Sequence, residues 1–160
     1  MEAPDRAALE ALLLDAYPWA RSLALMLTRN GFEADDLVQE AMSSFLRSPP
    51  QVLTAATVHV WLRTTIVREA TRRRRRALAE LKALARLFVQ PPPVPATGQP
   101  SDDMLRALRR LPPRQRAAIV LRYIHDQSEE QIAQTLGIAA GTVKAHLAQA
   151  RERLRDLLGD

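Results

Sequence analysis

Two groups of side chains in this sequence have the types and the spacing for contacts with a nucleic acid. The first is a run of five successive arginines, Arg72–Arg76. Five like charges in a row repel one another, and a phosphate backbone relieves that repulsion, so the run favours a polyanionic partner. The alternative is a plain solvated face, because such a run occupies every side of a helix. Arg72, Arg73 and Arg76 share one side at helical spacing and are the expected contact set.

The second group lies near the C-terminus, where the apolar residues Val143, Leu147 and Leu154 recur at helical spacing. The opposite face of that helix carries small and polar side chains. Small residues allow close approach to the DNA major groove, and polar ones can hydrogen-bond to base edges or phosphates. We expect the contacts of this face to come from Thr142, Lys144, Ala145, His146 and Gln149.

These contacts need a helix that is held in place by a preceding one, and the stretch Ser128–Arg155 has that plan. Ser128 is a good N-cap and Gln131 completes a capping box, while Gly137 is expected to stop the first helix. Two amphipathic helices joined by so short a turn are typical of a helix-turn-helix, whose second helix enters the major groove. The alternative is an ordinary helical hairpin whose polar residues only face water.

The sequence lacks the arrangements that support catalysis or cofactor binding. The histidines His59, His125 and His146 are scattered, and no nucleophile–base pair, metal-ligand spacing or phosphate-binding glycine loop is present. The absence of cysteine excludes disulfides and thiolate metal sites. We therefore expect no enzymatic activity, no metal and no cofactor.

Composition bounds the fold class and the location. With 160 residues, 47% of them hydrophobic, the chain can build one medium or two small cores, and the absence of strand-like alternation predicts an all-α protein. The net charge of +5 again favours a polyanion. No apolar run is long enough to span a bilayer, and the first ten residues lack a signal-peptide pattern, so we expect a cytoplasmic protein without membrane insertion.

The first half of the chain is expected to be helical. Helices are predicted over Asp5–Asp15, from Pro18 to about Thr28, over Phe32–Arg47, and from Thr54 or Ala56 to about Phe88. The apolar positions of the third leave Asp35, Asp36, Gln39, Glu40 and Ser43 outside. The buried stripe of the fourth places Trp61 in the core.

The plainest boundary in the sequence is the proline-rich stretch Gln90–Pro100, which is expected to be an extended linker. It separates an N-terminal helical domain, residues 1–89, from a C-terminal domain, residues 101–160. In the second domain, a helix capped by Ser101 ends at Leu111. Another helix, Arg114–Tyr123, precedes the helix-turn-helix and is expected to turn inward Ala117, Val120, Leu121 and Ile124.

Three stretches in this order give the chain a family resemblance: Glu33–Arg47, with its Asp-Leu-Val-Gln-Glu string, Val60–Arg76, and Leu108–Leu154. They are similar to the core-polymerase-binding helix, the proximal promoter helix and the distal promoter domain of bacterial RNA polymerase sigma factors. The group they resemble is the extracytoplasmic-function (ECF) group of the sigma-70 family. This resemblance implies a sigma factor that binds core RNA polymerase and directs promoter-specific transcription initiation.

The resemblance also implies residue roles and partners. The β′ clamp of core polymerase would be met by Asp36, Gln39 and Glu40. Promoter DNA near the melting point would be met by Arg63, Thr64, Arg68 and the arginine run, and the distal element by the second helix of the helix-turn-helix. The polymerase β subunit and an anti-sigma factor are the other partners that the family implies.

The sequence departs from the family pattern at the proximal promoter helix. The aromatic or Asp-containing cluster that often precedes the basic run is replaced here by Thr71-Arg72-Arg73, so the way in which unstacked bases are held differs from the family pattern. The competing hypothesis is a stand-alone helix-turn-helix regulator that binds an operator by itself.

Overall fold

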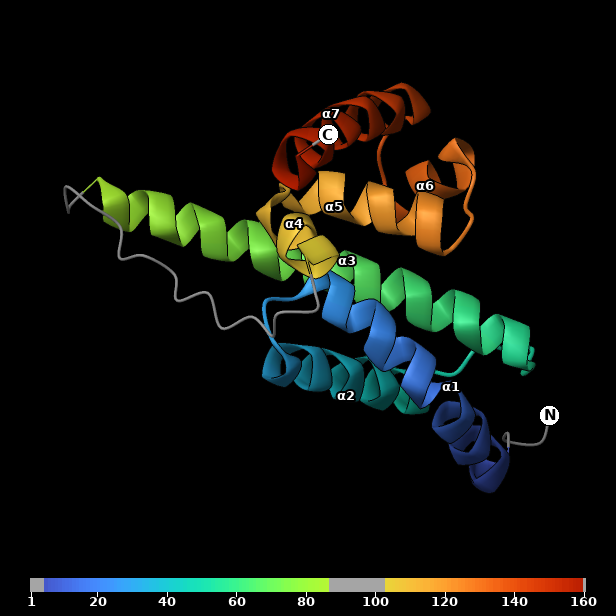
Figure 1. Cartoon of the computed structure of the whole chain (residues 1–160). Coiled ribbons are helices and arrows are strands. Elements are labelled where there is room, and N and C mark those ends of the chain that lie inside the picture. Colours follow the sequence, from blue (N-terminus) through green and yellow to red (C-terminus); the bar gives the residue numbers. More distant parts are fainter. Residues whose placement is uncertain (1–4, 87–102, 160) are drawn as a thin grey trace. The chain divides into compact units, whose positions relative to one another are not determined.

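The structure, a computed structural model, describes residues 5–86 and 103–159, and these form helices and connecting turns without a strand (Figure 1). The predicted all-α class is confirmed. The helices, in chain order, are α1 (Arg6–Leu27), α2 (Gly31–Arg47), α3 (Ala55–Ala85), α4 (Asp103–Arg110), α5 (Pro113–Ile119), the π-helix η1 (Val120–Ile124), α6 (Glu129–Leu136) and α7 (Ala140–Leu158).

The chain divides into two compact units, Met1–Ala70 and Thr71–Asp160, and the division falls within α3. The predicted linker, Gln90–Pro100, and the predicted cap Ser101 lie outside the described residues. No described helix combines the length and the apolar character needed to cross a bilayer.

The first unit begins with one continuous helix where the sequence predicted two. Pro18 lies inside α1, although proline was expected to open a second helix. Proline has no N–H to donate to the carbonyl of Leu14, so the helix loses one hydrogen bond at this point. Figure 1 shows the first part of α1 turning away from the rest. Burial of Leu13 and Ala16 before Pro18, and of Ala20 and Leu23 after it, keeps both parts on one core and offsets the loss.

Helices α1 and α2 pack against each other, and α3 completes the core of this unit. The predicted apolar face of α2 is buried, with Phe45 fully enclosed. The ring of Trp61 on α3 meets Phe45 edge-on, with centroids 5.2 Å apart, and Trp19 on α1 meets His59 in the same way at 4.7 Å. Trp61 thus contacts the core, as its place in the apolar stripe predicted.

In the second unit, α5 runs directly into the π-helix η1. Ala117, Val120 and Leu121 are buried as predicted, but Ile124 is 57% exposed, and its predicted inward orientation is wrong. The prediction assumed 3.6 residues per turn throughout. A π-turn closes i→i+5 hydrogen bonds and takes more residues per turn, so it rotates Ile124 away from the face that Ala117 and Leu121 share.

The helix-turn-helix forms with the predicted caps. The Ser128 hydroxyl accepts from the Gln131 N–H at 3.1 Å, and the Gln131 side chain accepts from the Ser128 N–H at 2.9 Å. Gly137 ends α6 with φ 67°, a left-handed conformation that glycine adopts without a Cβ clash. Val143, Leu147 and Ala150 then bury one side of α7.

The core of this unit also holds a charged side chain that the sequence pattern did not predict. Arg116 on α5 is 1% exposed, and its Nη2 donates to the carbonyl oxygen of Arg109 on α4 at 2.5 Å. A buried guanidinium must be hydrogen-bonded to offset the loss of its hydration, so this contact ties α4 to α5.

Candidate functional site

The first predicted interface is the outer face of α2. Asp36, Gln39 and Glu40 are all exposed, at spacings of three and four that keep them on one side of the helix. On the opposite side, Leu37 and Val38 are buried in the core. The apolar residues therefore carry the packing, and the three polar side chains are presented outward on a rigid element.

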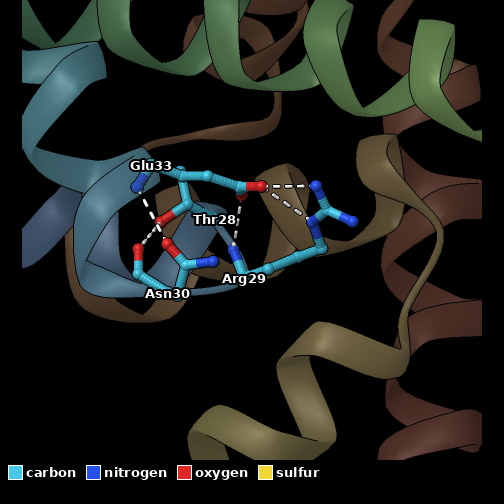
Figure 2. Close-up of polar contacts among 4 residues, drawn as sticks. All are labelled: Thr28, Arg29, Asn30 and Glu33. Atoms are coloured by element: carbon cyan, nitrogen blue, oxygen red, sulfur yellow. Dashed lines mark hydrogen bonds and ion pairs between the residues drawn. The ribbon is translucent and has the colours of Figure 1, made fainter. Parts of the chain in front are cut away.

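The start of α2 is fixed by a compact polar network at the corner between α1 and α2 (Figure 2). Asn30 is the N-cap, and its Oδ1 accepts from the Glu33 N–H at 2.9 Å. The Glu33 carboxylate accepts from the Arg29 backbone N–H at 3.1 Å and from the Arg29 Nε at 2.9 Å. The Thr28 hydroxyl bonds to the carbonyl of Ala24 at 2.7 Å and donates to the carbonyl of Asn30 at 3.3 Å, and the second bond ties the end of α1 into the same corner.

A second ion pair holds α2 to α1 farther along the helix. The Arg21 Nε donates to the Asp35 Oδ1 at 2.7 Å, and the Asp35 carboxylate raises the pKa of Arg21 above its ordinary value. Glu33 and Asp35 thus bind arginines next to α1, and Asp36 and Glu40 are exposed on the outer face of α2. Helical periodicity alone did not predict the ion pairs of Glu33 and Asp35.

On the first part of α3 the three predicted DNA contacts do not form one set. Thr64 and Arg68 share a side at a spacing of four, and Arg68 is exposed. Arg63 instead shares its side with Val67 and Ala70, which are both buried. Arg63 is half-buried, and this burial lowers its pKa.

The arginine run lies within α3 as predicted. Arg72 and Arg76 are exposed and Arg73 is half-buried, and all three lie on one side by helical spacing. Arg75 is also exposed and lies on the other side of the helix from Arg73. The family resemblance includes Arg75 among the promoter contacts, although helical spacing left it out of the expected set of Arg72, Arg73 and Arg76, and its exposure keeps it a candidate contact.

The third predicted interface is the outer face of α7, where Thr142, Lys144, Ala145 and Gln149 are exposed. Gln149 is not free to turn, because its Oε1 accepts from the Gln115 Nε2 of α5 at 3.0 Å. That bond fixes the direction in which the NH2 group of the Gln149 side-chain amide points.

His146 differs from the other predicted contacts of α7. It is half-buried, and neither of its ring nitrogens has a hydrogen-bond partner in the part of the chain that the structure describes. Burial, together with the nearby charge of Arg114, lowers the pKa of His146. The ring nitrogens are therefore buried and shielded from a ligand on the outer face.

The first turn of α7 has a feature that was not predicted from the sequence. Its N-cap, Ala139, makes no side-chain capping bond, in contrast to Asn30 of α2 and Ser128 of α6. Gly141 and Thr142 follow in the same turn and are exposed. The N-terminus of a helix attracts anions through its unpaired N–H groups and its dipole. In the described ranges, 5–86 and 103–159, no cluster of side chains could hold a metal ion.

Comparison with known proteins finds similarity over both units. The family model of sigma-70 region 2 matches residues 12–79, and that of sigma-70 region 4 matches residues 101–154. The chain is 36% identical over 157 residues to the ECF RNA polymerase sigma factor SigM of Mycobacterium tuberculosis, covering 98% of this chain and 80% of that protein. It is 30% identical over 149 residues to the ECF sigma factor EcfG of Rhodopseudomonas palustris, covering 91% and 82%.

A solved structure shows the same fold. The sigma factor RpoE of Bartonella quintana, in complex with the anti-sigma factor NepR, matches with a TM-score of 0.69 and 28% identity over 93% of this chain and 95% of that one. Two family models in the expected order, and relatives matched over most of their length, agree with the resemblance seen in the sequence. The chain belongs to the ECF group of sigma-70 family RNA polymerase sigma factors.

Proposed function

We propose that this sigma factor binds core RNA polymerase through the outer face of α2 and contacts promoter DNA through α3 and α7. The observation that carries the proposal is that one chain holds both a region 2 and a region 4 of the sigma-70 family. A stand-alone helix-turn-helix regulator needs only the second of these, so the region 2 match favours the sigma factor. The role is that of an initiation subunit acting beside polymerase in the cytoplasm, with no catalytic reaction of its own.

The polymerase contact is assigned to Asp36, Gln39 and Glu40. Their exposure on a helix that is already anchored by its apolar side supports this assignment, because changes there leave the core untouched. The partner surface is the coiled coil of the β′ clamp, to which the family resemblance points.

The promoter contacts are assigned to two regions. On α3, Thr64, Arg68 and the exposed arginines of the run approach the proximal element, and phosphate neutralisation supplies most of their affinity. On α7, Thr142, Lys144 and Ala145 enter the major groove of the distal element. The uncapped first turn of α7 supports this assignment, because its N–H groups can bind a phosphate.

Regulation by an anti-sigma factor is part of the proposal. The similar Bartonella sigma factor was solved in complex with NepR. A protein that covers the polymerase-binding face of α2 would keep this chain from core polymerase.

The decisive experiment measures binding of the full chain to purified core polymerase, together with transcription in vitro from genomic fragments. Gln39→Ala with Glu40→Ala is expected to weaken core binding by about tenfold or more, the effect of losing interface residues worth at least 1.4 kcal/mol. The fold should be kept, because both sites are exposed and alanine favours helix.

A matched control removes one acid and one neutral polar side chain from the exposed part of α1, as Glu10→Ala with Ser22→Ala. The control should bind core polymerase like the wild type. Unchanged binding in the α2 variant would refute the assigned face, and failure of the wild-type chain to direct transcription would refute the function itself.

A further inference from the structure

We propose that Phe32 is an apolar anchor of the polymerase-binding face of α2. The inference rests on the function proposed above and adds a contact that the acidic and amide side chains cannot supply. Phe32 is 87% exposed, the largest exposed fraction among the large hydrophobic side chains of the described residues. A single exposed apolar side chain is common on a protein surface, but a phenyl ring on a fixed helical turn beside other proposed contacts can add apolar area to a binding face.

The exposure of Phe32 is not a result of a frayed helix end. Phe32 lies in the first turn of α2, between Gly31 and Glu33. The Asn30 cap and the bonds between Glu33 and Arg29 hold this turn from both sides (Figure 2). The backbone that carries the ring is therefore fixed, and the ring is presented to solvent without loss of helical order.

Phe32 also lies on the same stripe as the proposed polymerase contacts. Asp36 follows it by four residues, Gln39 by seven and Glu40 by eight, and these spacings return to one side of an α-helix. At a rise of 1.5 Å per residue, the stripe from Phe32 to Glu40 is about 12 Å long. The ring and the polar groups can thus reach one partner surface together.

The chemistry of this stripe specifies its occupant. An aromatic ring beside two exposed carboxylates fits a surface that offers an apolar pocket next to basic groups. Continuity with Gln39 and Glu40 identifies that surface as the coiled coil of the core polymerase β′ clamp. Interfaces of this kind gain most of their affinity from a few buried aromatic or basic anchors and less from exposed charge pairs.

The test compares the affinity of the full chain and its variants for core polymerase across a salt series. Phe32→Ala is expected to weaken binding about tenfold, which corresponds to 1.4 kcal/mol, and to leave the salt dependence unchanged because no charge is lost. Phe32→Leu should recover most of the affinity. Leu14→Ala is the matched control, because Leu14 is 75% exposed on α1 and lies off the stripe.

The variants separate this inference from the proposed function. Wild-type affinity in Phe32→Ala, alongside weakened binding in Gln39→Ala with Glu40→Ala, would overturn the anchor and leave the α2 face in place. Unchanged affinity in both would refute the face as a whole. If the wild type dimerises and Phe32→Ala is a monomer with unchanged polymerase affinity, the ring serves a second copy and the inference is wrong.

Discussion

Helices α2 and α7 each present an outer face to a proposed partner, but their first turns are built in opposite ways. The first turn of α2 is closed by the Asn30 cap and by the Glu33 carboxylate, which accepts hydrogen bonds from Arg29. The first turn of α7 begins at Ala139 without a side-chain cap. The first turn of α2 thus has a side-chain cap, and the first turn of α7 has none.

The exposed charges of the two helices also differ, and they too suit different partners. The outer face of α2 carries the carboxylates of Asp36 and Glu40. The exposed part of α7 carries an excess of cations, contributed by Lys144, Arg151, Arg153 and Arg155. A capped, acidic helix suits contact with a protein, and an uncapped, basic helix suits phosphate, so the two helices match the two classes of proposed partner.

The largest expected effect comes from a negative charge on the DNA-facing side of α7. Ala145→Glu should weaken binding to distal promoter DNA by more than about 100-fold, because the carboxylate meets phosphates and base edges. Stability should hardly change, since Ala145 is exposed and glutamate is a good helix former. Band shifts and thermal melts measure the two effects. The variant Leu157→Glu places the same charge about three turns further along α7 and should bind DNA like the wild type.

The comparison is tested most directly by giving α7 the kind of cap that α2 has. Ala139 has φ −71° and ψ 147°, the extended conformation that an N-cap adopts. Ala139→Asp should raise the free energy of unfolding by about 1 kcal/mol and lower DNA affinity by about tenfold, because the carboxylate occupies the open N–H groups and repels phosphate. Ala139→Ser, a cap without charge, should gain stability and lose less affinity. Equal DNA affinity in all three proteins would show that the open turn has no part in binding.

The arginine run of α3 should give a smaller effect that appears in the salt dependence. Arg73→Gln with Arg76→Gln should lower the slope of log affinity against log salt by about 0.9 for each lost duplex contact, or about 0.7 where the strands are open. Promoter opening by the reconstituted holoenzyme is the measurement, and core binding should persist. Lys82→Gln with Arg86→Gln removes the same charge farther along the chain and is the control. A slope that falls only with Arg75→Gln would assign the contact to the other side of the helix.

The smallest effect is expected at the corner before α2. Glu33→Ala should lower the free energy of unfolding by about 0.5 kcal/mol, because its ion pair with Arg29 is partly exposed. Polymerase affinity should fall slightly, since Phe32 loses its fixed turn. Glu10→Ala breaks another ion pair of i,i+4 spacing, Arg6–Glu10, and should leave affinity unchanged. Equal affinity in the two variants would show that the corner does not position the α2 face.

The sequence by itself determined the elements that depend on local chemistry. Ser128, Gln131 and Gly137 specify a helix start and a helix stop through bonds within a few residues, so the helix-turn-helix was predictable. The period of the apolar residues of α2 likewise separated its buried side from its exposed side. The all-α class and the family followed from the same local patterns.

Features that depend on residues distant in the chain were decided only by the tertiary structure. The sequence predicted a break at Pro18, but burial on both sides of it keeps α1 continuous. The π-turn rotates Ile124 outward against the helical period. Burial within the fold removes the ring nitrogens of His146 from solvent, near the charge of Arg114 on α5. The ion pair of Arg21 with Asp35 joins residues fourteen positions apart, and it forms because the fold packs α1 against α2. A helical pattern predicts on which side of the helix a residue lies. Its partner depends on which other residues the fold places next to that side.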